Sequence, residues 1–124
     1  MSAEQNIASI KACYRAFDAS DITAAMKDVA DDVEWTVPGE STLSGTYRGK
    51  DEVVGCLMKL AEKSYTSVPE HFLGDDDRVV VLARTTSDGK PSDQVDVYTF
   101  REGKVATFYC VLDTLLQQQV WGSK

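Results

Sequence analysis

A chain of 124 residues is the size of one domain, and a hydrophobic fraction of 43% is typical of a globular protein. Its 20 acidic and 13 basic residues give a net charge of -7, which disfavours nucleic acid and anionic membranes as partners. No apolar run approaches a membrane span, and three widely spaced cysteines resemble neither a disulfide framework nor a metal site. We therefore expect a cytoplasmic protein with reduced thiols and no metal or other cofactor.

The first half of the chain is predicted to contain three helices. Residues 4–19 carry apolar side chains at helical spacing, and Ser20 or Asp21 can cap a second helix. The apolar face of this second helix is formed by Ile22, Met26 and Val29. A third helix is predicted to begin near residue 50, where acidic residues suit the positive end of a helix dipole.

A short strand and a glycine-punctuated loop separate the second and third helices. The strand is predicted over residues 32–37 and ends at Pro38, which cannot donate a hydrogen bond to a sheet. A loop over residues 44–49 then leads into the third helix. Trp35 and Val37 point to the same side of the strand. We expect this segment to form the rim of a small-molecule pocket.

In the second half, the apolar pattern changes to the period of two that strands show. Four strands are predicted over residues 68–74, 78–87, 93–101 and 104–112. The last three are joined by two tight turns, each containing a glycine, and residues 113–121 are predicted to form a short helix. Helices followed by an antiparallel meander predict an α+β fold, in which a curved sheet wraps around the helices as a cone with one open mouth.

Several short motifs occur together over nearly the whole chain. They are YRAF at 14–17, SD at 20–21, ADDVEW at 30–35, PG at 38–39, SGTYRG at 44–49, FREGKV at 100–105, and Asp113 with its leucine-rich tail. Their order resembles the SnoaL-like (polyketide-cyclase-like) branch of the nuclear-transport-factor-2-like (NTF2-like) superfamily, which also contains ketosteroid isomerase. The resemblance implies one domain over residues 1–124, with three N-terminal helices packed in a curved, mixed, mostly antiparallel sheet. It also implies an apolar pocket and, often, a homodimer formed through the outer sheet face.

Strand alternation predicts which side chains line this pocket. An outer face containing Val95, Val97, Tyr109 and Val111 is unusually apolar for a monomer, so we expect a homodimer to cover it. The largely aromatic lining suits a flat apolar ligand. It is expected to include Tyr14, Phe17, Trp35, Val37, Met58, Asp96, Tyr98, Phe100, Phe108 and Cys110.

Asp96 is the most suggestive single residue. A carboxyl group among Tyr and Phe side chains loses hydration, so its pKa should rise toward neutrality. By resemblance, Asp96 and Tyr14 match the two hydrogen-bond donors of the ketosteroid isomerase oxyanion hole, which polarise a bound carbonyl. The alternative is a structural ion pair between Asp96 and Arg84 on the neighbouring strand.

The family's proton carriers are missing from this sequence. Ketosteroid isomerases carry an Asp immediately before the proline that matches Pro38, where this chain has Val37. Polyketide cyclases use an Asp and a His at positions that match Cys110 and Tyr98. His71, the single histidine, is a candidate for proton transfer, but alternation does not decide whether it points into the pocket or out to solvent.

Two functions follow from these residues. The first is an isomerase or cyclase acting on an apolar carbonyl compound, with Tyr14 and Asp96 polarising the carbonyl and His71 or a water molecule transferring the proton. The second is a non-catalytic ligand-binding or scaffold protein that keeps the pocket. The substitutions at the proton-carrier positions favour the second, and a carboxyl group inside an aromatic pocket favours the first.

Overall fold

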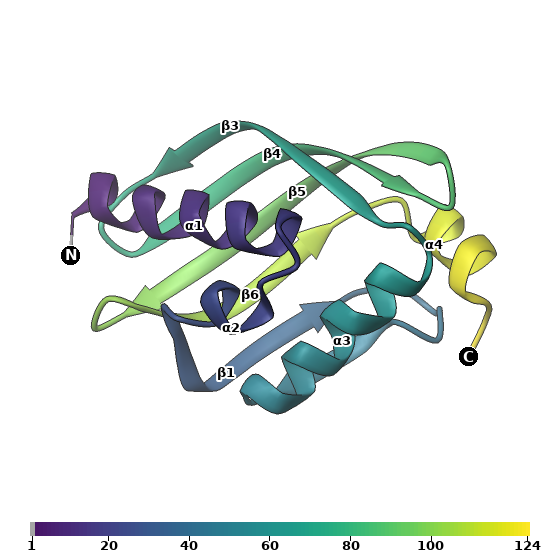
Figure 1. The fold of residues 1–124 in the computed structure, drawn as a ribbon, viewed down its shortest axis with the longest axis horizontal. Coiled ribbons are helices and arrows are strands. Elements are labelled where there is room, and N and C mark those ends of the chain that lie inside the picture. The colour runs from purple at the N-terminus through teal and green to yellow at the C-terminus, as the bar shows by residue number, and fades with distance from the viewer. Residues whose placement is uncertain (1) are drawn as a thin grey trace.

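The computed structural model describes residues 2–124, which form four helices and six strands (Figure 1). These elements are α1 (Ala3–Asp18), α2 (Ile22–Ala25), β1 (Val29–Val37), β2 (Gly45–Arg48), α3 (Lys50–Glu62), β3 (Thr66–Gly74), β4 (Arg78–Ser87), β5 (Lys90–Arg101), β6 (Lys104–Val111) and α4 (Thr114–Trp121).

The six strands form one mixed sheet in the order β2-β1-β6-β5-β4-β3. The β1–β6 pair is parallel and every other pair is antiparallel. Figure 1 shows the sheet curving around α1, α2 and α3, with α4 beside one end of the sheet. This arrangement confirms the predicted α+β cone, including the meander from β3 to β6.

Side-chain caps begin three of the helices. Ser2 and Gln5 form a capping box at the start of α1, and the Asp21 and Asp113 carboxylates accept backbone hydrogen bonds at the starts of α2 and α4. The second helix is much shorter than predicted, because Val29 pairs with Val105 and begins β1 instead of extending the helix. No helix within residues 2–124 is long and apolar enough to cross a membrane.

The predicted loop over residues 44–49 is wrong for four of its residues. Residues 45–48 form β2, the edge strand, which pairs antiparallel with β1. Across this pair Trp35 lies opposite Tyr47, and the hydroxyl oxygens of Thr36 and Thr46 are 3.1 Å apart. Pairing with a neighbouring strand therefore overrides the local signal of the two flanking glycines.

The core lies between the inner face of the sheet and the helices. In β4, Val79 and Val81 are fully buried on this inner face, while Leu82 on the outer face is 36% exposed. The outer face also leaves Tyr109 and Val111 of β6 exposed, at 46% and 53%. Side chains of the continuous apolar run in β4 therefore contribute alternately to the core and to an apolar outer face.

Candidate functional site

A cavity of about 100 Å³ lies between the inner sheet face and the helices. Its volume is several times what one water molecule requires. Eight of the residues predicted to line a pocket do line it: Tyr14, Phe17, Trp35, Val37, Asp96, Tyr98, Phe108 and Cys110. The sequence pattern therefore located most of the lining correctly.

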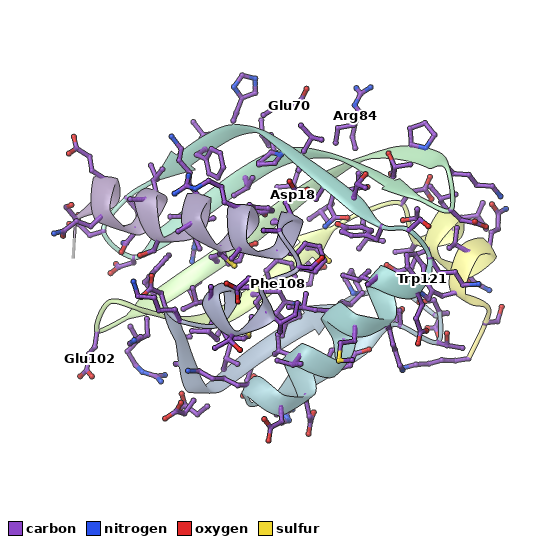
Figure 2. All side chains as sticks on the ribbon, in the orientation of Figure 1. Asp18, Glu70, Arg84, Glu102, Phe108 and Trp121 are labelled. Carbon is purple, nitrogen blue, oxygen red and sulfur yellow. The ribbon has the colours of Figure 1, made fainter. Side chains whose placement is uncertain are left out.

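Aromatic rings form one wall of the cavity. Trp35 on β1 and Phe108 on β6 are opposite each other in the parallel ladder, and their rings stack with centroids 3.9 Å apart. The ring of Tyr98 on β5 lies against both of them. Figure 2 shows Phe108 in the interior, between the sheet and the helices. This wall offers a flat apolar surface to a ligand.

A chain of hydrogen bonds ends on the carboxyl group of Asp96. The Tyr98 hydroxyl donates to the Tyr14 hydroxyl at 2.9 Å, and Tyr14 donates to Oδ2 of Asp96. On the other side, Nε2 of Gln94 donates to Oδ1 of Asp96 at 2.7 Å. Asp96 is only 3% exposed. Each of its two oxygens therefore accepts one hydrogen bond inside the cavity.

Burial controls the protonation of these groups. It raises the pKa of Asp96, although the hydrogen bonds from Gln94 and Tyr14 oppose the rise. Burial also raises the pKa of Tyr14 and of Tyr98, and the nearby Asp96 adds to both shifts. The phenols therefore remain neutral donors, and the carboxyl group holds a proton to higher pH than an exposed Asp.

The suggested ion pair between Asp96 and Arg84 is wrong. Arg84 lies on the outer face, where its guanidinium is 3.2 Å from Oδ1 of Asp93, the residue opposite it on β5. Figure 2 shows Arg84 pointing away from the helices. Asp96 instead lies opposite Val81, whose side chain is buried in the core. Alternation along β5 therefore places Asp93 and Asp96 on opposite faces.

His71 is exposed and does not line the cavity, so its predicted role in proton transfer there is wrong. The reason is a break in the register of β3 between Pro69 and His71. Glu70 is an extra residue at this point, so His71 pairs with Leu82 on the outer face. A β-bulge of this kind reverses the alternation, which explains why the pattern alone left the direction of His71 open.

Two further residues predicted to bind the ligand do not reach the cavity. Met58 is 61% exposed, because the buried stripe of α3 runs through Val53, Cys56 and Leu57. Phe100 packs against the core but lies beyond Tyr98 on β5, after a register shift at Thr99. Neither residue lines the cavity.

All three cysteines line the cavity, but as unreactive thiols. Burial raises the pKa of Cys13 and of Cys56 to about 11, and it raises the pKa of Cys110 as well. A thiol is a good nucleophile only as the thiolate, so these residues act mainly in packing. Within residues 2–124, no group of three His, Cys, Asp or Glu side chains is arranged to hold a metal ion.

Several polar residues of the cavity were not predicted: Tyr65, Ser67, Thr85, Ser87, Ser92, Gln94, Asp113 and Gln117. Gln94 is two residues before Asp96 on β5, so strand alternation could have placed both on the same face. Tyr65 comes immediately before β3, where no periodic pattern signals its direction. Its hydroxyl is buried, and burial together with the nearby Asp96 raises its pKa.

The rim of the cavity is held by the side chain of Gln117 on α4. Nε2 of Gln117 donates to the hydroxyl oxygens of Ser41 at 2.8 Å and Ser44 at 3.0 Å, and is 3.3 Å from the carbonyl oxygen of Pro38. At Gly39, φ is +105°, and a Cβ atom there would lie 3.1 Å from the Thr114 side chain. The Pro38-Gly39 turn and α4 therefore pack closely at the cavity mouth.

This chain is similar in sequence and in fold to several known proteins. Residues 10–108 match the family model of the SnoaL-like domain. An uncharacterised protein of Mycobacterium tuberculosis (strain H37Rv) is 29% identical, over 98% of this chain and 99% of its own. An NTF2-like protein of Burkholderia xenovorans LB400 is 28% identical with a TM-score of 0.82, over 98% of each chain. TerC, crystallised with polyporic acid, is also 28% identical, with a TM-score of 0.84 over 96% of this chain and 99% of its own.

Proposed function

Because this chain belongs to the SnoaL-like domain family, within the NTF2-like fold, we propose that it binds a small, flat, apolar carbonyl compound in the cavity. Asp96 would polarise the carbonyl oxygen, and Tyr14, whose hydroxyl donates to Asp96, would hold the carboxyl group in position. The observation that carries this proposal is a buried carboxyl group that accepts hydrogen bonds from Gln94 and Tyr14, beside an aromatic wall.

The chemistry follows from the protonation of Asp96. Its raised pKa favours the neutral acid, whose proton can be donated to an oxygen atom in the cavity. Such a donor in a dry site stabilises the negative charge that develops on a carbonyl oxygen when an adjacent carbon loses a proton. Tyr14 and Gln94 hold the carboxyl group in place. This polarisation is the step that carbonyl isomerisation and cyclisation share.

The ligand with which TerC was crystallised belongs to the class of compound proposed for this cavity. Polyporic acid, with which that protein was co-crystallised, is a diphenyl-substituted dihydroxybenzoquinone and so carries carbonyl groups beside aromatic rings. A similar ligand fits the chemistry of the stacked Trp35 and Phe108 rings and of the donor at Asp96. Polyporic acid is accordingly a sensible first compound to test for binding.

We expect the phenolic steroid equilenin to bind in the cavity, with a change in its naphthol fluorescence. Its phenol oxygen stands in for the carbonyl oxygen, and the emission reports hydrogen bonding to that oxygen. Tyr14→Phe should weaken binding about tenfold, since it removes the donor to Asp96 and leaves the Tyr98 hydroxyl without its acceptor. Fluorescence titration of both proteins measures the difference.

The matched control is Tyr109→Phe, which removes the same hydroxyl from the outer sheet face, where Tyr109 is 46% exposed. This variant should bind equilenin as the unchanged protein does. An unchanged emission spectrum on mixing would show that equilenin does not bind at Asp96, and equal affinities for Tyr14→Phe and Tyr109→Phe would show that Tyr14 does not position Asp96 for binding.

The second candidate function is ligand binding without catalysis. Val37, Tyr98 and Cys110 occupy the positions where the family resemblance expects proton carriers, and all three line the cavity. Val37 has no proton to transfer, and burial raises the pKa of Tyr98 and of Cys110. The two functions predict the same binding, but only the first allows turnover of a β,γ-unsaturated ketone to its conjugated isomer.

We also propose that the outer sheet face forms a homodimer. Leu82, Val95 and Val111 follow one another across β4, β5 and β6, and Val97 and Tyr109 form the next row. Leu82, Tyr109 and Val111 are all at least 36% exposed. A contiguous apolar patch of this kind is unusual on a monomer.

Light scattering should give a mass of twice 13.6 kDa for the unchanged protein. Val111→Lys should shift the mass to that of the monomer, because it buries a charge in the interface. The control Met58→Lys changes a similarly exposed apolar residue on α3 and should leave the mass unchanged. A monomeric mass for the unchanged protein at micromolar concentration would be incompatible with this dimer.

A further inference from the structure

A second polar region lies on the inner sheet face, at a distance from Asp96. Ser67 on β3 pairs with Thr85 on β4, and Thr85 pairs with Ser92 on β5. All three line the same cavity as Asp96. We call these three residues the hydroxyl row. Because neighbours in register on adjacent strands project to the same face, their side chains lie side by side.

The hydroxyl row has unused hydrogen-bonding capacity. Oγ of Ser67 is buried and has no hydrogen-bond partner among the described residues. The Tyr65 hydroxyl lies near Ser67, and this neighbour opposes the rise in the pKa of Tyr65. The geometry nevertheless leaves the Ser67 hydroxyl without a hydrogen-bond partner. Thr85, which is 3% exposed, makes a long hydrogen bond of 3.4 Å to the carbonyl oxygen of Ser92. The Ser92 hydroxyl donates to the carbonyl oxygen of Asp93 at 3.2 Å, so Ser67 is the member of the row whose hydroxyl proton is unused. Buried polar atoms normally have partners, so this region is suited to a polar group of a ligand.

The position of the hydroxyl row indicates the shape of that ligand. Ser92 and Asp96 are four residues apart on β5, which corresponds to about 13 Å along the strand. The aromatic wall of Trp35, Tyr98 and Phe108 belongs to the Asp96 end of the cavity, since Tyr98 is two residues beyond Asp96. The cavity therefore presents donors at two separated places.

From this placement we infer that Ser67 of the hydroxyl row donates a hydrogen bond to a second oxygen of the ligand, at the end opposite the polarised carbonyl. The inference rests on the proposed function and narrows its ligand class. The ligand is an elongated molecule with a carbonyl group at one end and a carbonyl or ether oxygen at the other. Ser67 is then a residue that determines specificity without polarising the first carbonyl.

The test compares equilenin with its 17-deoxo analogue, which lacks only the ketone oxygen at the far end. With the phenol at Asp96, equilenin should bind the unchanged protein roughly fivefold more tightly than the analogue, because one hydrogen bond is added. In Ser67→Ala the two ligands should bind equally, with the affinity of the analogue unchanged. Thr86→Val, which alters the outward-facing neighbour of Thr85, should retain the preference.

The outcomes separate this inference from the proposed function. Equal affinity of the unchanged protein for both ligands, or a preference that persists in Ser67→Ala, overturns the role of the hydroxyl row. In either case Tyr14→Phe would still weaken both ligands equally if the proposed function is correct. If neither ligand binds, both the proposed function and the hydroxyl-row inference fail.

Discussion

Phe108→Ala is expected to lower the free energy of unfolding by about 3–5 kcal/mol, the usual range for removing a buried aromatic ring. Phe108 is 6% exposed and stacks on Trp35, and its ring centroid lies 5.0 Å from that of Tyr98. Alanine would leave a gap that joins the existing cavity, so the neighbouring rings would lose contacts without regaining them from packing. Urea unfolding followed by tryptophan fluorescence measures this loss.

The matched variant is Phe108→Leu, which keeps most of the apolar volume and should cost less than about 1.5 kcal/mol. Both variants should retain the slope of the unfolding transition, because they expose similar surface on unfolding. If Phe108→Ala costs no more than Phe108→Leu, the ring does not pack as the structure describes. Both variants remove the flat ring beside Trp35, so their difference reports on the packed volume at this position.

The second large effect concerns the dependence of stability on pH. Burial raises the pKa of Asp96 above its ordinary value of 3.8, so the folded protein binds this proton more tightly than the unfolded chain does. The stability that the proton contributes is fully present below the unfolded pKa and is lost as pH rises through the folded pKa. Asp96→Asn removes this loss and should raise the free energy of unfolding at neutral pH, by about 1.4 kcal/mol for each unit of the pKa shift.

Urea unfolding between pH 4 and pH 8, at roughly one-unit intervals, tests the linkage. The asparagine oxygen can still accept from Tyr14, and the Gln94 amide can rotate to offer its oxygen to the new NH₂ group. Asp93→Asn is the control, because Asp93 is exposed on the outer face of the same strand. The same pH dependence in all three proteins would contradict a raised pKa at Asp96.

Strand alternation was enough to place most of the site. On β5 and β6 the inner face follows the period of two, so the sequence alone assigns Asp96, Tyr98, Phe108 and Cys110 to the cavity. The same rule excludes the Asp96–Arg84 ion pair once the strand register is known, since the two residues are out of register. Periodicity is informative here because the sheet has one buried face.

The errors occurred where tertiary structure overrides a local pattern. A bulge at Glu70 turns His71 outward, and Pro69 just before it is compatible with either an edge strand or a bulge, so the sequence alone does not fix the register. Val29 extends the predicted strand because a distant strand, β6, offers it a partner. Gly45 and Gly49, at the two ends of β2, likewise favour a loop in the sequence, but pairing with β1 makes the segment a strand. Each error depends on a partner that is remote in the sequence or on a register that only the folded sheet establishes.

The parallel pairing of β1 with β6 has a consequence for folding. The strands from β3 to β6 can assemble through local hairpins, whereas β1 must find β6 across most of the chain. Contacts between distant segments carry a larger entropic cost and form more slowly than local ones. Trp35 and Phe108 face each other across this pair, so the two halves of the aromatic wall meet only when the long-range pairing is made. Ligand binding is therefore a property of the completed fold, because a chain arrested at the meander would lack the Trp35 half of the aromatic wall.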